Sequence, residues 1–136
     1  MSFSKVAALL YATISAGVVA FQIALAAGAP WGSYAMGGAF PGSFPPALRI
    51  AAIVQAALLV GLATVVLARA ALILPRWFSA SRWLVWVVVA FAALSLVLNI
   101  ITPSAGERAI WAPVAFLLLI SSIAVALIKP LDRPVR

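Results

Sequence analysis

The sequence contains no cysteine and no histidine, and only two of its 136 residues are acidic. Without cysteine, the chain cannot form a disulfide, a thiolate metal site or a thiol redox centre. Without histidine, it also lacks the usual protein ligand of haem, copper and zinc. These absences predict a protein with no metal site and no cofactor. They also argue against an enzyme, because one glutamate beside an arginine offers little general acid–base chemistry.

Charge of either sign is scarce: 8% of the residues are charged and 67% are hydrophobic. In soluble domains about 25% of residues are charged, so this composition predicts an integral membrane protein whose main partner is the lipid bilayer. The net charge is +7, but the basic residues stand singly at the ends of apolar runs. Because they form no basic patch, nucleic acid is excluded as a partner.

Four apolar runs are long enough to cross the roughly 30 Å of bilayer hydrocarbon as helices. We expect the membrane spans at about residues 6–27, 49–74, 83–101 and 105–128. Each run is followed by a proline, at positions 30, 75, 103 and 130. Strand alternation is missing, and backbone groups must be satisfied internally in lipid, so helices are the expected form. The sequence therefore predicts an all-α membrane protein, with residues 1–136 forming a single transmembrane domain, a bundle of four transmembrane helices.

The orientation of the bundle follows from its lysines and arginines. With four spans, seven of these cations fall on the side of both termini and only two, Arg49 and Arg108, on the other. Positively charged loops stay in the cytoplasm, so both termini are expected to be cytoplasmic. The first span resembles a signal peptide in its basic start, but its apolar run exceeds the roughly 7–15 residues of a signal core. We therefore expect it to be retained.

Small residues recur every four positions along the first span. The series consists of Ala8, Ala12, Ala16, Ala20 and Ala24. This small-xxx-small pattern lets two helix backbones approach closely, which favours self-association or assembly into a larger membrane complex. The alternative is that an alanine-rich helix shows such spacing by chance.

Polar side chains within the spans are few and lie in their outer halves. The three amides are Gln22, Gln55 and Asn99, and no acid, lysine or histidine lies near the bilayer centre. This absence argues against a proton-coupled exporter that uses a membrane carboxylate. The amides can either hydrogen-bond between helices, which stabilises by about 0.6 kcal/mol on average, or line a solvated outer cavity.

The loop between the first two helices is rich in glycine, proline and aromatic residues, and reads "GAPWGSYAMGGAFPGSFPPALR" from position 28 to 49. Its glycines and prolines prevent a regular helix. Its aromatic residues, including Trp31 and Tyr34, make it too apolar for a flexible linker. We expect it to fold back, either as an interfacial cover or as a lid over the level of the amides.

The stretch "SAGERAIWAP", residues 104–113, holds the only glutamate of the chain. Ser104 and Glu107 have the spacing of a capping box, in which each side chain accepts a hydrogen bond from the other residue's backbone amide. Glu107 is also the one acid able to pair with Arg49 on the outer face, so a bridge between the second and fourth helices is expected, with Asn99 beside it. Arg108 is expected to lie near Trp111 or to bind lipid phosphate.

These outer segments resemble a family of small, uncharacterised four-span membrane proteins of bacteria. The resemblance rests on "APWG", "GG" and "PPALR" in the first outer loop, and on N-x-x-T-P-S-x-x-E-R-x-x-W-x-P-V at 99–114. It implies a multi-pass protein of the bacterial cytoplasmic (inner) membrane. It implies no known activity.

Two functional classes remain open. The first is a structural or accessory membrane subunit, as a homo-oligomer or as part of a larger complex. The second is an outward-facing binding or transport protein for a lipid-like or small amphipathic ligand. Its candidate site comprises Gln22, Trp31, Tyr34, Arg49, Gln55, Asn99, Glu107, Arg108 and Trp111.

Overall fold

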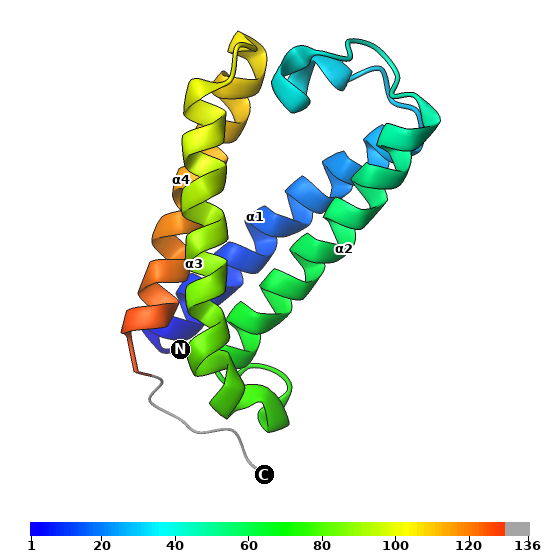
Figure 1. Cartoon of the computed structure of the whole chain (residues 1–136). Coiled ribbons are helices and arrows are strands. Elements are labelled where there is room, and N and C mark those ends of the chain that lie inside the picture. Colours follow the sequence, from blue (N-terminus) through cyan, green and yellow to red (C-terminus); the bar gives the residue numbers. More distant parts are fainter. Residues whose placement is uncertain (130–136) are drawn as a thin grey trace.

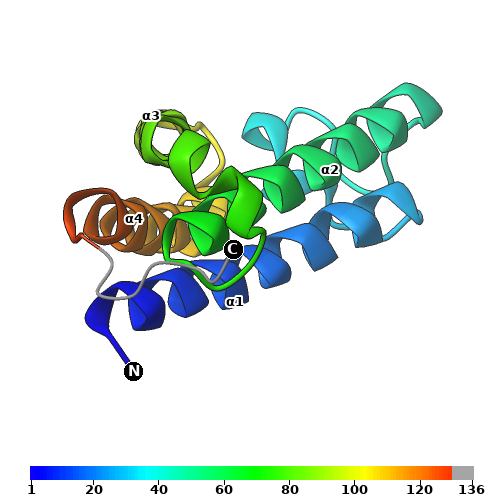
Figure 2. The ribbon, with the colours of Figure 1, turned by 90° about the horizontal axis from the view of Figure 1, so that it is seen from below.

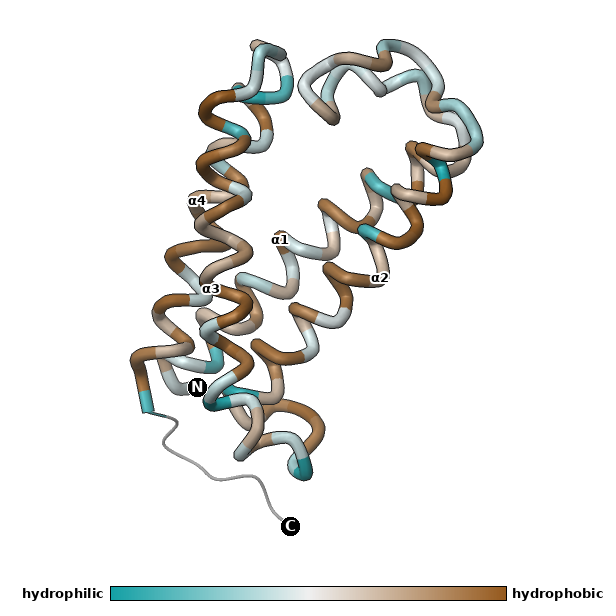
Figure 3. The backbone as a smooth tube through the Cα atoms, in the orientation of Figure 1, coloured by the Kyte–Doolittle hydropathy of each residue, from teal (hydrophilic) through white to brown (hydrophobic). Residues whose placement is uncertain are grey.

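The computed structural model describes residues 1–129, and this part of the chain is all-helical (Figure 1). The long helices are α1 (Phe3–Ala26), α2 (Pro46–Arg69), α3 (Phe78–Ile101) and α4 (Ala105–Leu127). Short 3₁₀ helices occupy Gly32–Tyr34, Met36–Gly38 and Pro75–Trp77. All four long helices are long and apolar enough to span a membrane, which confirms the predicted class of a multi-pass, four-helix protein. Hydrophobic residues run along all four of them, and most hydrophilic ones gather towards the ends (Figure 3).

The turn between α2 and α3 differs from the prediction. The second span was expected to continue to residue 74, but α2 ends at Arg69, and α3 begins five residues before the expected position 83. Ala71 adopts a left-handed conformation with φ 61°, and the amide of Leu72 returns to the carbonyl of Leu67 at 3.0 Å. This is a Schellman ending, which usually has glycine at the left-handed position. Hydropathy continues through these residues, whereas the helix does not.

The helices form two antiparallel pairs, α1 with α2 and α3 with α4, and α1 also packs against α4. The two pairs are close together where the chain starts and α4 ends, and they diverge towards the opposite end (Figures 1 and 2). We call the first the terminal end and the second, which carries residues 27–45 and 102–104, the loop end.

The main hydrophobic core lies at the terminal end. Its buried members are Ala7, Ala8, Tyr11, Leu62, Val66, Ala70, Val85, Val88 and Val125. Four of these are valines with no exposed surface. A smaller cluster of Leu25, Phe44 and Ala52 joins α1, α2 and the loop at the other end. Buried side chains thus fill the interior of the bundle at the terminal end, whereas at the loop end the buried cluster lies between α1, α2 and the loop.

The alanine series of α1 does not form one buried stripe. Ala8 is buried, whereas Ala16 and Ala20 are exposed. The buried face instead follows Ser4, Ala8, Tyr11 and Ser15, with steps of three and four residues. A step of four residues advances by about 400° around a helix, so the alanine series winds from the core to the surface.

Candidate functional site

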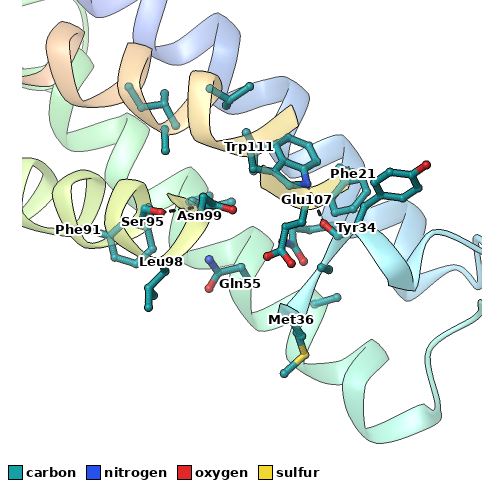
Figure 4. A pocket seen from close by; sticks show the side chains of 18 of the residues that line it. Phe21, Tyr34, Met36, Gln55, Phe91, Ser95, Leu98, Asn99, Glu107 and Trp111 are labelled. Carbon is teal, nitrogen blue, oxygen red and sulfur yellow. Dashed lines mark hydrogen bonds between the residues drawn. The ribbon is translucent and has the colours of Figure 1, made fainter. Parts of the chain in front are cut away.

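A cavity of about 430 Å³ lies between the four helices in the half of the bundle nearest the loop end. Its polar lining contains most of the residues singled out in the sequence, namely Gln22, Tyr34, Gln55, Asn99, Glu107 and Trp111, together with Ser95 (Figure 4). Trp31, Arg49 and Arg108 do not line it. The volume is within the roughly 300–1,000 Å³ typical of small-molecule sites.

Small side chains help to leave this space open. Ala52, Ala92 and Ala115 line the cavity from α2, α3 and α4, and all three are buried. At the terminal end the corresponding space is filled by β-branched valines. The cavity therefore follows from the divergence of the helix pairs and from the size of the residues that face it.

The two glutamine amides are without hydrogen-bond partners. Within residues 1–129, neither Gln22 nor Gln55 makes a hydrogen bond to the protein, and both line the cavity from α1 and α2. Asn99 donates its Nδ2 only to the carbonyl of Ser95 on its own helix, at 2.7 Å. The interhelical hydrogen bonds that were one alternative for these amides do not form. The geometry agrees with the other alternative, a polar cavity.

Glu107 fastens the loop to α4. Its backbone amide donates to Ser104 Oγ at 3.2 Å, which is the first half of the expected capping box. The second half is wrong: the Glu107 carboxylate does not accept from the Ser104 amide, which donates to Thr102 Oγ1 instead, at 3.3 Å. Glu107 Oε2 accepts from the Thr102 hydroxyl and from the backbone amide of Gly37, both at 2.9 Å. The acid thus links the helix cap to a loop residue 70 positions away.

The expected bridge between Arg49 and Glu107 is absent from the described part of the chain. Arg49 Nε donates to the carbonyl of Phe44 at 2.7 Å, and the guanidinium packs beside Gly28, just past the end of α1. A helix C-terminus carries partial negative charge, which provides the arginine with a counter-charge. Arg49 therefore has backbone partners at its own end of the bundle and needs no carboxylate.

Arg108 follows the same principle on the other helix pair. It is exposed, and its Nη2 donates to the carbonyl of Thr102 at 2.8 Å. Thr102 is the C-terminal cap of α3. Both arginines of the loop end thus donate to a backbone carbonyl of the segment just before their own helix, Phe44 for Arg49 and Thr102 for Arg108, and neither lines the cavity.

The loop covers the cavity as a lid, which we define as residues 28–45. Tyr34, Ala35 and Met36 line the cavity from above. Two side chains near the start of α4 bind lid carbonyls: Ser104 Oγ donates to Ser33 at 2.8 Å, and Trp111 Nε1 donates to Tyr34 at 2.9 Å. Together with the Gly37–Glu107 bond, these contacts tie the lid to α4.

Two glycines permit this close packing. A Cβ on Gly32 would lie 1.9 Å from the carbonyl oxygen of Phe40, and one on Gly106 would lie 2.7 Å from the Tyr34 ring. The Gly32 position excludes a side chain because its neighbours are backbone atoms, whereas a Cβ on Gly106 would require the Tyr34 ring to shift. Trp31 lies outside the cavity, where its ring stacks on Phe21 at a centroid distance of 6.3 Å. Phe21 in turn contacts Trp111 at 4.6 Å, so the aromatic residues form a wall between α1 and α4.

The cavity opens sideways between α2 and α3. Four of its lining residues are exposed, namely Tyr34 and Met36 on the lid, Ala51 on α2 and Leu98 on α3. More than half of the surface of Met36 and Leu98 is exposed, at 54% and 53%. In addition, α2 and α3 pack together less extensively than the helices within each pair. This side of the bundle is the one through which a molecule could enter from the bilayer.

Sequence reasoning missed two positions of the candidate site. Tyr11 lines the deep end of the cavity. Only 2% of its surface is exposed, and it makes no hydrogen bond within the described residues. Thr102 connects Glu107 to the helix cap. A signal for Thr102 was present, since a threonine two residues before a capping serine can bond locally to backbone amides. Tyr11 carried no such signal within its apolar run.

Comparison of the chain with protein-family models, with curated proteins and with solved structures finds no match. The likeness to small four-span bacterial proteins thus rests on the short motifs alone. The function has to be argued from the cavity and its lid.

Proposed function

We propose that this protein binds a small amphipathic ligand in the lidded cavity. The observation that carries the proposal is the pair of unpartnered amides, Gln22 and Gln55, facing a space of about 430 Å³. Both side chains are half-buried and their amide atoms remain accessible from the cavity, so they are available to bind the polar atoms of a ligand.

The distribution of the lining supports an amphipathic ligand. Polar groups lie towards the lid, and the deeper wall is formed by apolar residues such as Leu59, Phe91 and Leu118. A polar head would therefore lie under the lid, and an apolar tail would lie in the deeper part or extend between α2 and α3 into the lipid. Entry through that side opening matches a ligand dissolved in the membrane.

The loop end faces the outside of a bacterial inner membrane in this proposal, with both termini in the cytoplasm. The seven-to-two distribution of cations between the two ends supports this orientation. Reporter fusions after Arg82 and after Arg136 should both give a cytoplasmic signal. An extracytoplasmic signal from either fusion would refute the orientation.

Ligand binding is tested by filling the cavity. In lipid nanodiscs, Ala92→Trp should abolish saturable labelling by a photoreactive alkyl amphiphile, because the indole occupies the space that the tail needs. Ala90→Trp is the matched control, since Ala90 is exposed on the same helix. Ser95→Phe provides a second filling variant if the first does not fold. Undiminished labelling in a folded filling variant would refute the proposal.

A role as an accessory subunit is the second candidate. Thr13, Ala16, Gly17 and Ala20 form an exposed face of small residues on α1, and a Cβ on Gly17 would meet nothing within 4 Å. Such a face allows another helix to approach closely. If it is an interface, Gly17→Leu should lower the oligomeric state measured by native mass spectrometry, whereas Gly61→Leu on the open face of α2 should not.

A further inference from the structure

We infer that the ligand carries a positively charged ammonium head, which the Glu107 carboxylate binds under the lid. This inference rests on the proposed function and specifies the ligand of the same cavity. Glu107 is the only acidic or basic residue among the described residues that line the cavity, and no lysine or arginine lines it. The fixed charge of the site is therefore negative.

The Glu107 carboxylate has capacity left for a ligand. Both of its hydrogen bonds, from Gly37 and from Thr102, are accepted by Oε2. Within the described residues, Oε1 accepts none and no cation pairs with Glu107. In Figure 4 the carboxylate points into the space beside Gln55 and Met36. A carboxylate oxygen has two acceptor sites, so Oε1 can bind a charged donor without disturbing the lid.

The groups around the carboxylate suit a cation as well. Phe21, Tyr34 and Trp111 line the same end of the cavity (Figure 4). Aromatic faces attract ammonium groups, and aromatic residues beside a carboxylate are a recurring way to bind them. Asn99 uses one N–H of its amide for the Ser95 carbonyl, and its oxygen remains available as a further acceptor.

An anionic head is disfavoured by the same arrangement. Arg49 and Arg108 are the two cations of the loop end, and each donates to a backbone carbonyl outside the cavity. A phosphate, sulfate or carboxylate head under the lid would meet Glu107 without a compensating cation from the lining. Like charges at such short range in a poorly solvated site repel strongly.

The test compares three photoreactive probes with the same alkyl tail, in nanodiscs: a primary ammonium, a neutral acetamide and a sulfonate. The ammonium probe should label the native protein at concentrations at least about tenfold lower than the acetamide, which is the difference expected when one partner of a hydrogen bond or ion contact is charged. The sulfonate should label least. Glu107→Gln keeps an acceptor for Gly37 and should remove the preference for the ammonium probe.

A charge-matched control separates a direct contact from a general field. Ala105→Lys adds one positive charge at an exposed position two residues before Glu107. Glu107→Gln raises the net charge by the same amount, so the two variants are matched in net charge. Residues two apart on a helix do not face each other, and an exposed lysine is weakened by water and salt, so Ala105→Lys should reduce the preference less than Glu107→Gln does. Equal losses in both variants would overturn the inference.

The remaining outcomes distinguish this inference from the proposed function. If all three probes label the cavity saturably and Ala92→Trp stops them, but Glu107→Gln changes nothing, the ammonium inference is overturned and the binding function stands. If Ala92→Trp stops none of them, the binding function itself fails. Labelling in nanodiscs with and without phosphatidylethanolamine identifies the natural ligand. If this lipid competes with the ammonium probe, the ligand is a membrane lipid. If it does not compete, the ligand is a free amphipathic amine.

Discussion

The terminal end and the loop end are built from the same four helices, yet they use opposite means of holding together. At the terminal end, buried valines and alanines of all four helices fill the interior. At the loop end, the interior is a cavity, and the structure is held by hydrogen bonds between the lid and the start of α4. Packing across all four helices thus stabilises one end, whereas at the other end the polar contacts of the lid supplement a small apolar cluster and the aromatic wall. A membrane bundle can keep an open interior at one end because the other end is closed.

The largest effect is expected from a glycine of the lid. In Gly32→Ala, the new Cβ would collide with the Phe40 carbonyl, which lies 1.9 Å from its ideal position. Because backbone atoms cannot move aside easily, the lid should lose at least about 3 kcal/mol of stability. Hydrogen exchange of the lid amides measures this loss. Gly61→Ala, where a Cβ meets nothing within 4 Å, is the control and should leave the lid protected.

A direct comparison of the two ends uses one substitution at two buried alanines. Ala8→Leu adds volume to the filled core and should cost about 1–3 kcal/mol. Ala92→Leu adds the same volume beside the cavity and should cost less than about 1 kcal/mol, because the side chain has room. The exposures of the two native residues are similar, at 0% and 3%. Thermal unfolding in detergent distinguishes them, and equal losses would contradict the difference in packing.

The carboxylate of Glu107 should matter to the lid through its acceptor atoms. Glu107→Ala leaves the Gly37 amide and the Thr102 hydroxyl without their partner, so the lid should lose about 1–3 kcal/mol. Glu107→Gln retains one acceptor oxygen and should lose less. The exchange rate of the Gly37 amide reports both effects. A Gly37 amide that stays equally protected in Glu107→Ala would show that the other lid contacts suffice.

The smallest effect is expected for the two cavity amides. Gln22→Leu and Gln55→Leu remove no hydrogen bond of the described residues, so each should change the unfolding free energy by less than about 0.5 kcal/mol. Amides that bridge helices would lose about 0.6 kcal/mol on average and up to about 1.7. Unfolding measurements on the purified protein separate these cases. A loss near the upper value would indicate an interhelical bond in the membrane.

The extent of each helix was predictable only where the chain changes its polarity. The first and fourth helices were expected within a few residues of their ends, because a serine cap or a polar loop marks them. The end of α2 was wrong because residues 70–74 stay apolar while Ala71 turns left-handed. Hydropathy carries no information on that backbone conformation.

The sequence predicted the level at which the polar side chains lie along the helices, but not which groups they bind. Gln22, Gln55 and Asn99 were expected at one level, and all three line the cavity. The pairing of Arg49 with Glu107 was argued by elimination among side chains. It failed because backbone groups, the Phe44 carbonyl and the Gly37 amide, are the actual partners. Such partners depend on how the loop folds, which local sequence patterns do not specify.

The lid also has a mechanical consequence. Its two covalent anchors are on α1 and α2, while its hydrogen bonds are to the start of α4, on the other helix pair. The two pairs resemble levers that share a fulcrum at the valine core and are tied together by a strap at their far ends. Widening of the gap between α2 and α3 would stretch this strap, and its three fastenings to α4 are short contacts that break within a small displacement. The force needed to separate the two helix pairs is therefore set by the lid. Substitutions in the lid can change this force without altering the valine core.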